Sequence, residues 1–275
     1  MCAAAQTRDR DSAYFQLLSL VVRSRRRWPP GLLVERSAPR WAALYPLQFW
    51  LGWDWVVSEA AQRKAIAADS NYAFAHRMLG IVLSHLCRHE EAIASIRRAR
   101  ELDPLIAMNR ALSSQIAFAA RDFPAALHFA REAVVIDPEF WIGYHQLAQA
   151  YFHPQQNELA LDALSHANRL SAGNSKALSL RGYLLASVNR RAEALEVLQT
   201  LDSVSSKRFF PPYAIALIHA GLSLHDPAHV ALTLDWLERA SEAHGVHLVF
   251  LTVDPKWDVF RTEPRFEAIL KRCGF

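Results

Sequence analysis

Aspartate residues recur along the chain at a fixed spacing of 34 residues, and this period constrains the fold more than any other feature of the sequence. Asp69, Asp103 and Asp137 keep this spacing, and Pro104 and Pro138 directly follow the second and third. A period between about 20 and 50 residues is typical of chains that stack copies of one structural unit. The sequence therefore predicts a repeat protein, whose length of 275 residues need not correspond to a number of globular domains.

Small side chains recur at fixed positions within each unit. Counted from Ala73, they occupy the eighth, twentieth and twenty-seventh positions, which are Gly80, Ala92 and Ala99. Two helices approach closely only where one of them presents a small residue. We therefore expect each unit to be an antiparallel helical hairpin. The Asp-Pro step should end its second helix, because proline disfavours helical geometry in the preceding residue, and the proline should begin the next helix.

With this register the chain resembles the tetratricopeptide repeat (TPR) family. The resemblance implies an all-α, right-handed TPR superhelix of five to six hairpins, closed by a capping helix around Pro264 to Arg272. The frame slips by five residues after Ser206 and returns from Ala214. We expect residues 1–38 to form a basic N-terminal arm that is poorly ordered or partly helical. Six repeat units should follow, and residues 246–275 should form the C-terminal cap. The units are 39–72, 73–106, 107–140, 141–174, 175–210 and 211–245.

Two motifs at the ends of the array narrow the resemblance. Trp53-Asp54-Trp55 is similar to the opening repeat of one bacterial group of TPR regions. The stretch from Val253 to Asp258 is similar to the closing signature of the same group. In that group the repeats follow a winged-helix regulator, a class III adenylyl cyclase or a serine/threonine kinase. Residues 1–38 are too few for any of these domains, and no glycine-rich nucleotide loop occurs in the sequence. The resemblance therefore implies bacterial signalling or transcriptional control without the family's catalytic half.

Positive charge is concentrated at the N-terminus. The net charge is +4, but residues 1–40 alone hold eight arginines against three acidic residues, which leaves the other 235 residues at −1. A near-neutral repeat body lacks the basic surface that phosphate backbones require, so we expect no nucleic acid binding by the TPR body. The run Arg23 to Arg27 is interpreted as a solvated arm, with contact to nucleic acid or an acidic membrane as the alternative.

The sequence gives no sign of a membrane span or of a disulfide framework. No stretch reaches the roughly 18 to 20 apolar residues that cross a bilayer, and no signal peptide is apparent. Cys2, Cys87 and Cys273 are odd in number and widely spaced, which is typical of free thiols. We therefore expect a cytoplasmic protein.

Catalytic and metal-binding patterns are weak. His219, His225 and His229 lie near Asp226, but their spacing matches no zinc motif. Acidic pairs such as Glu90-Glu91 fall in second helices on the outer surface, where solvated charge is the ordinary role. No serine occupies a Gly-x-Ser-x-Gly turn. The sequence therefore predicts a protein that is not an enzyme and holds no cofactor or metal.

The concave groove is the candidate binding site. The resemblance implies that the second, fifth, ninth and twelfth positions of each first helix line it. The residues read from these positions, or beside them, are Phe74, Arg77, Ile81, Met108, Gln115, Phe118, His145, Gln149, Phe152, Lys176, Tyr183, Ile218, His219 and Leu222. Aromatic rings, amides and two cations suit an extended peptide or a partner helix.

Two functions remain open from the sequence. The first is a scaffold that binds a partner protein or peptide in the groove. The second is a sensory or regulatory module that binds a small ligand, or self-associates, to control a separately encoded cyclase, kinase or DNA-binding protein. The sequence does not separate them, and it leaves homo-oligomer formation open.

Overall fold

A computed structural model describes residues 49–50, 52–152, 155–205 and 211–275. The N-terminal arm, and the first helix expected of the unit 39–72, lie outside the described residues. Regular secondary structure in the described residues is entirely helical, as the TPR pattern predicts. The helices are α3 (Trp55–Ala68), α4 (Ala73–His85), α5 (His89–Leu102), α6 (Ala107–Ala119), α7 (Phe123–Ile136), α8 (Trp141–Phe152), α9 (Asn157–Leu170), α10 (Ser175–Ser187), α11 (Arg191–Ser205), α12 (Pro212–Leu222), α13 (Ala228–Glu242), η3 (Val246–Phe250), η4 (Pro255–Phe260) and α14 (Pro264–Arg272).

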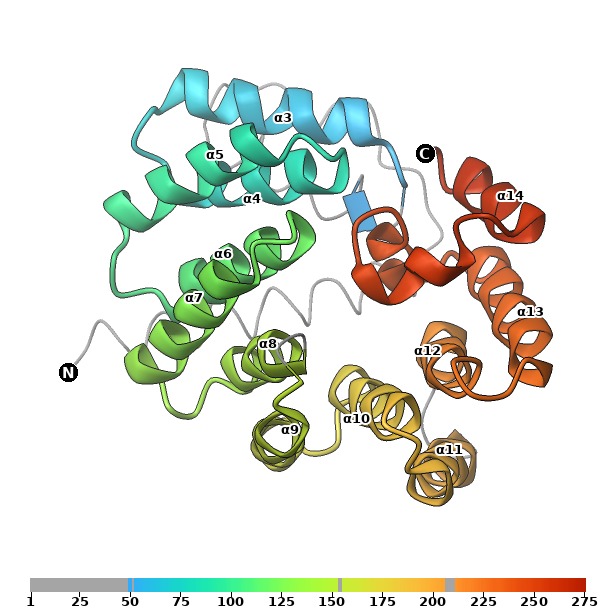
Figure 1. The fold of residues 1–275 in the computed structure, drawn as a ribbon. Helices are drawn as coiled ribbons and strands as arrows, with labels where there is room; N and C mark the ends of the chain where they lie inside the picture. The colour runs from blue at the N-terminus through green and yellow to red at the C-terminus, as the bar shows by residue number, and fades with distance from the viewer. Residues whose placement is uncertain (1–48, 51, 153–154, 206–210) are drawn as a thin grey trace.

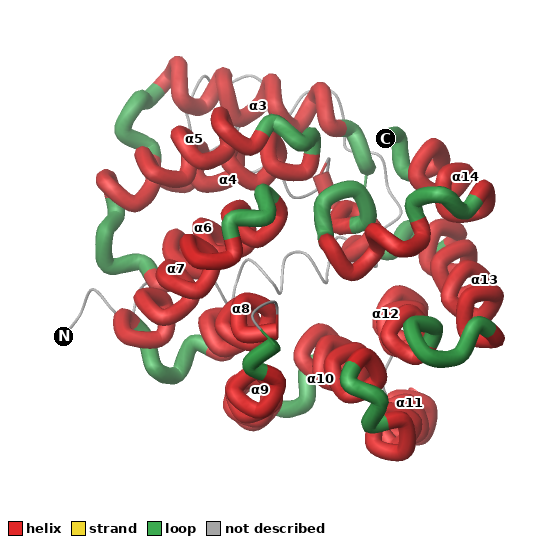
Figure 2. The backbone as a smooth tube through the Cα atoms, in the orientation of Figure 1, coloured by secondary structure: helices red, strands yellow, loops and turns green. Residues whose placement is uncertain are grey.

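Helical hairpins follow one another around a ring. Figure 1 shows the pairs α4/α5, α6/α7 and α8/α9 placed in sequence order, with α10 to α14 completing the circle back toward α3. The tube in Figure 2 shows the two short 3-10 helices lying inside this circle. The chain is therefore a solenoid whose last part returns to its first.

The 34-residue period is visible in the backbone at the tip of successive hairpins. Cys87, Arg121, Gln155 and Asn189 all have positive φ, between 59° and 65°. At each tip the next N–H donates to a carbonyl five residues back, at 2.8 to 3.0 Å. This left-handed turn closes the end of the first helix and reverses the chain. These positions cannot be recognised in the sequence, because none holds the glycine that usually marks such a turn.

The aspartates that define the period end the second helices, as predicted. Asp69, Asp103 and Asp137 are the C-terminal caps of α3, α5 and α7. The carboxylates of Asp69 and Asp137 each accept a hydrogen bond from the backbone N–H two residues further on. The expectation that the proline begins the next helix is wrong: Pro104 lies in the turn, and α6 starts at Ala107. The proline stops one helix without starting the other.

Glycines mark the closest helix approaches, but not always within one hairpin. A Cβ on Gly80 would lie 3.1 Å from the carbonyl oxygen of Ala92, across the predicted contact of α4 with α5. Gly182 on α10 instead faces α12, where an added Cβ would lie 2.6 Å from Cδ1 of Ile218. In this part of the array two first helices pack directly on each other, where the sequence frame slips.

The two ends of the described chain pack together. The indole nitrogen of Trp55 donates to the carbonyl of Gly274 at 3.1 Å, and its ring stacks on Phe275 with centroids 4.5 Å apart. Trp53 stacks on His244 at 4.8 Å. The opening motif thus packs against residues near the C-terminus and holds the ring shut, which explains the aromatic residues at these two ends. Helix α14 has the bounds that the sequence predicts for the capping helix.

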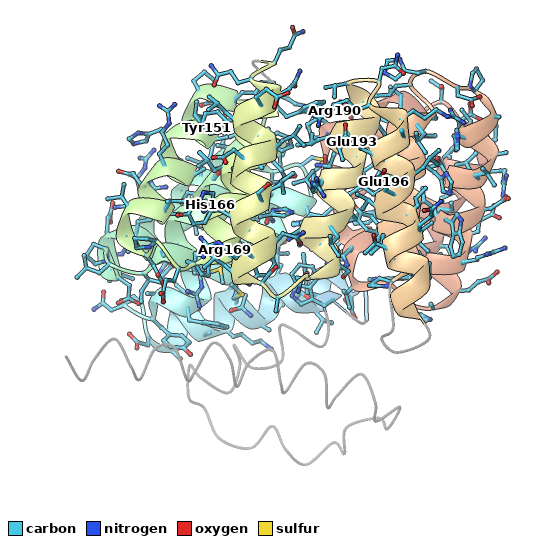
Figure 3. The ribbon with its side chains drawn as sticks, turned by 90° about the horizontal axis from the view of Figure 1, so that it is seen from below. Tyr151, His166, Arg169, Arg190, Glu193 and Glu196 are labelled. Carbon is cyan, nitrogen blue, oxygen red and sulfur yellow. The ribbon has the colours of Figure 1, made fainter. Side chains whose placement is uncertain are left out.

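The outer surface carries charged side chains in repeated ion pairs. Arg88 pairs with Glu59 and Glu91, and Arg190 pairs in the same way with Glu158 and Glu193. Figure 3 shows Arg190 and Glu193 at the start of α11. Such solvated pairs contribute little to stability. The charged side chains of the outer face therefore form solvated ion pairs of the kind that is common on protein surfaces.

Candidate functional site

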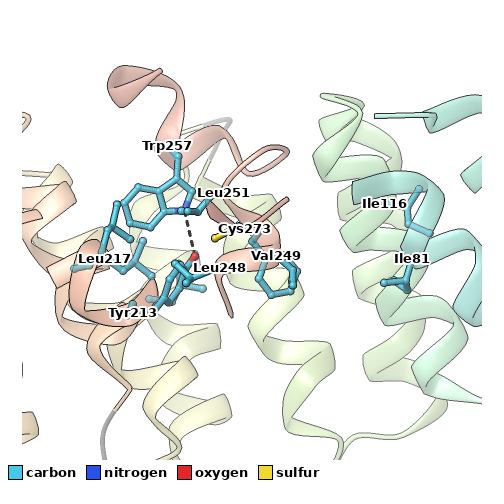
Figure 4. Packing of buried hydrophobic residues seen from close by; sticks show 14 of the residues in the cluster. Ile81, Ile116, Tyr213, Leu217, Leu248, Val249, Leu251, Trp257 and Cys273 are labelled. Atoms are coloured by element: carbon cyan, nitrogen blue, oxygen red, sulfur yellow. Dashed lines mark hydrogen bonds between the residues drawn. The ribbon is translucent and has the colours of Figure 1, made fainter. Parts of the chain in front are cut away.

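The concave surface is occupied by the chain's own C-terminal segment, which we define as residues 246–260. Trp257 anchors it: its side chain is fully buried, and its indole nitrogen donates to the hydroxyl of Tyr213 on α12 at 3.1 Å (Figure 4). Leu217, Leu248 and Leu251 surround this contact in the core. Burying an indole ring is worth several kcal/mol, so the segment belongs to the folded core.

Lys256 connects the segment to the first helices of three units. Its ammonium donates to the side-chain oxygen of Gln149 on α8 at 2.7 Å and pairs with Asp254 at the same distance. The rings of Phe118 on α6 and Tyr183 on α10 lie 5.3 and 6.0 Å from it. Lys256 is only 7% exposed, and a buried ammonium needs such partners. Three residues predicted for the groove thus meet at one side chain.

Main-chain contacts hold the segment as well. Arg121, in the turn after α6, donates to the carbonyl of Val253 at 2.7 Å and makes a two-pronged ion pair with Asp258 at 2.9 Å. The hydroxyl of Thr252 donates to the carbonyl of His85 at 3.2 Å. The concave surface therefore contacts both the backbone and the side chains of this segment, which consists of two short 3-10 helices and the turn between them.

The predicted groove residues fall into two regions on α4 to α10. Those that line one cavity with the segment or contact its side chains are Gln115, Phe118, His145, Gln149, Lys176 and Tyr183. At the opposite ends of α4 and α6, Phe74, Arg77 and Met108 are half-buried, with the Arg77 guanidinium 5.0 Å from the Phe74 ring. Ile81 is buried in the main core, and the Phe152 ring packs edge-on against Tyr183.

Helix α12 does not present the three residues read from its sequence frame. Ile218 packs against Gly182, His219 faces His229 on α13, and Leu222 lies in a separate core cluster. Tyr213, Ala214 and Leu217 face the concave side instead. The positions counted from the sequence are displaced by one residue toward the C-terminus. Successive residues of a helix are about 100° apart around its axis, so this displacement selects a different face. The slip of five residues in the sequence frame before α12 removed the spacing by which the frame could be aligned.

The histidines near Asp226 do not converge. The Nδ1 atoms of His219 and His229 lie 2.8 Å apart, but His225 bonds to the carbonyl of Ser187. Asp226 pairs with Arg191 at 2.9 Å and is 3.8 Å from His229. Within the described residues no group of three or more potential ligands could hold a metal ion.

A cavity of about 50 Å³ lies between the C-terminal segment and the first helices. Its titratable lining groups are His85, His145, Lys176, Tyr213, His247, Asp254 and Lys256. Burial lowers the pKa of His85 to about 4 and that of His247 to about 3. Burial, followed by the positive charge of Lys256, lowers the pKa of Lys176 to about 8. The histidines are therefore neutral near pH 7 while positive charge remains in the cavity.

Comparisons with known proteins identify the fold. No family model matches the sequence, and no curated protein matches it. Among solved structures, the Cut9 and Hcn1 hetero-tetramer of the APC/C is similar over 86% of this chain and 43% of that chain, with 14% identity and a TM-score of 0.58. The TPR protein TTC0263 of Thermus thermophilus is similar over 72% of this chain and 99% of that chain, with 20% identity and a TM-score of 0.53. At such identities the likeness shows the fold alone, and that fold is the TPR superhelix.

One further observation concerns membranes. In the described part of the chain, none of the helices combines the length and the apolar character that crossing a bilayer needs.

Proposed function

We propose that the chain is a non-catalytic scaffold that binds a peptide segment of a partner protein, or the partner protein itself, on its concave surface. The observation that supports this proposal is the way this surface holds residues 246–260. Arg121 bonds to a backbone carbonyl, and a lysine enters a slot lined by Phe118 and Gln149. Grooves that recognise peptides use the same combination of backbone bonds and side-chain pockets.

The partner would bind at the N-terminal ends of α4 and α6, beside the C-terminal segment. That segment contacts the other ends of these helices, through His85, Phe118 and Arg121. Arg77 and Met108, with the Phe74 ring, supply a cation, a flexible apolar chain and an aromatic surface. Arginine and aromatic residues are enriched among the side chains that dominate binding energy. An acidic or aromatic side chain on the partner would complement them.

A bacterial signalling or transcriptional context belongs to the same proposal. It rests on the likeness of the Trp53-Asp54-Trp55 and Val253 to Asp258 motifs to one group of TPR regions. In the structure these residues close the ring and fill its interior, so their first role is to shape the scaffold. The partner in this context is a separately encoded signalling or DNA-binding protein.

The test is affinity capture with chemical cross-linking from the source cells, using two charge-reversal variants. Arg77→Glu changes the concave surface, whereas Arg97→Glu makes the same change on the exposed face of α5. The proposal predicts that a protein captured by the wild type and by Arg97→Glu is lost from Arg77→Glu, with its cross-links on α4 and α6. Retention of every captured protein by Arg77→Glu would refute the concave surface as the binding site.

A further inference from the structure

The cavity under the C-terminal segment has an excess of one positive charge. Of the charged side chains that line it, Lys176 and Lys256 are cations and Asp254 is the anion. Asp254 pairs with Lys256 at 2.7 Å and so neutralises that lysine. The ammonium of Lys176 makes no ion pair with any of the described residues. It lies over the ring of Phe250, 5.1 Å from the ring centre. Lys176 is partly buried, and an ammonium in such a cavity without an ion-pair partner favours a bound anion of one charge.

Two histidine nitrogens in the same cavity lack hydrogen-bond partners. Both histidines are nearly fully buried, at 1% exposure for His85 and 3% for His145. Nδ1 of His85 donates to the carbonyl of Ile81 at 2.7 Å, so Nε2 of the neutral ring is an acceptor without a donor. Nδ1 of His145 is likewise buried and unpaired. Buried polar atoms are rarely left unpaired, so each indicates a position for a missing partner.

The three groups line the same cavity, as does Phe250. The His85 ring and the Lys176 ammonium each lie 5.1 Å from the ring centre of Phe250. The positive charge of Lys176 also acts on His145 and His247, in addition to the burial that dominates their lowered pKa values. One small molecule beside Phe250 can therefore contact an ammonium donor and a histidine acceptor together.

Size and apolar lining define the class of ligand. By the space that one water molecule needs, a cavity of about 50 Å³ holds roughly three to five waters, or a molecule of about five non-hydrogen atoms. Phe118, Leu180, Leu217 and Phe250 form apolar parts of its wall. Inorganic phosphate has no apolar part and carries more than one charge near neutral pH. A short organic acid has both an alkyl portion and a single charge.

We propose that this cavity binds a short hydroxycarboxylate, with its carboxylate on the Lys176 ammonium and its hydroxyl donating to Nε2 of His85. Nδ1 of His145, in its protonated tautomer, donates to the second carboxylate oxygen. This site differs from the partner surface at Phe74, Arg77 and Met108, and it does not depend on it. The bound acid also contacts the C-terminal segment through Phe250, so it stabilises the closed arrangement.

The test is isothermal titration calorimetry with glycolate, lactate, acetate and inorganic phosphate at pH 7, combined with thermal unfolding. We expect glycolate or lactate to bind more tightly than acetate, and phosphate to bind least. Lys176→Met should weaken hydroxycarboxylate binding at least tenfold, because a charge-assisted bond is lost. Lys271→Met, which removes an exposed lysine on α14, should bind as the wild type does. Circular dichroism checks that each variant is folded, and Lys176→Gln replaces Lys176→Met if the latter is not.

A second variant tests the hydroxyl contact. His85→Phe should bind acetate as the wild type does but lose the preference for glycolate over acetate. Three results would each overturn the proposal: no heat and no thermal shift with any carboxylate at about 20 mM, tighter binding of phosphate than of the hydroxycarboxylates, or unchanged lactate and glycolate affinity in both Lys176 variants.

Discussion

The ammonium of Lys256 lies 2.7 Å from the side-chain oxygen of Gln149, although 107 residues separate them in the sequence. This bond links the C-terminal segment to the middle of the helical array. With the ion pair to Asp254 it allows a lysine to be buried in the concave surface. The ring-shaped arrangement of hairpins depends on such contacts between distant parts of the chain.

Replacement of Gln149 by leucine should destabilise the fold. The substitution removes one of the two acceptors of Lys256 and leaves a buried ammonium partly unsatisfied, which costs about 1 to 3 kcal/mol. Gln199→Leu is the matched control, because Gln199 is exposed on α11. Urea unfolding measures both variants. Equal midpoints for the two would show that the bond contributes nothing to stability.

Closure of the ring should make the two ends depend on each other. Trp55→Ala removes a nearly buried indole that bonds to Gly274 and stacks on Phe275, and large core truncations of this kind cost about 3 to 5 kcal/mol. We expect faster amide hydrogen exchange in α14 as well as in α3. Faster exchange confined to α3 would contradict the closed arrangement.

Gly221 should tolerate no side chain. A Cβ there would lie 2.7 Å from the carbonyl oxygen of Tyr183 on α10, and backbone atoms cannot move aside without shifting a helix. Overpacking of this kind costs about 1 to 3 kcal/mol. At Gly143, where the nearest atom would be 3.3 Å away on the Val134 side chain, the same change to alanine should cost less. A lower midpoint temperature of thermal unfolding for Gly143→Ala than for Gly221→Ala would contradict this expectation.

Acid should destabilise the protein through its buried histidines. Burial lowers the pKa of His85 to about 4 and of His247 to about 3, both below the ordinary 6.5. Between pH 6.5 and about 4 the unfolded chain binds protons at these rings while the folded chain does not, so stability is full above pH 6.5 and falls as the pH drops. At pH 5.5 the loss is about 1 kcal/mol for each ring.

The control for this prediction is His85→Phe, which removes one of the rings that must be charged. Urea unfolding at pH 7.5 and 5.5 should show a smaller difference between the two pH values in the variant than in the wild type. A pH dependence that is the same in both proteins would assign the acid effect to other groups.

The sequence predicts the parts of the fold that repeat and misses the parts that do not. The 34-residue spacing identifies the caps Asp69, Asp103 and Asp137, and the resemblance to TPR proteins implies the bounds of α14. The caps depend on local chemistry that recurs in each unit, and α14 is a short amphipathic stretch. The left-handed turns at Cys87 and Arg121 repeat as well, but their residue types share no property from which they could be recognised.

On α6, α8 and α10, where the frame holds, residues predicted for the groove line the cavity beside the C-terminal segment or contact its side chains, and their role in binding a partner stays a prediction. The concave face of α12 was not predictable. After the frame slip, the counted positions are displaced by one residue, so they select residues packed between helices in place of residues on the concave face such as Tyr213. The occupation of the concave surface by residues 246–260 was also missed. Lys256 carries a charge, which by itself predicts exposure, and only its distant partners Gln149 and Phe118 make it a buried residue.

The position of the C-terminal segment is tested most directly by nuclear Overhauser effects in the full chain. The account predicts contacts between the indole protons of Trp257 and both the Tyr213 ring and the Leu217 methyl groups, since the two ring centres lie 5.5 Å apart. Absence of these contacts, with Trp257 showing the signal of a solvated indole, would contradict the account and leave the concave surface empty.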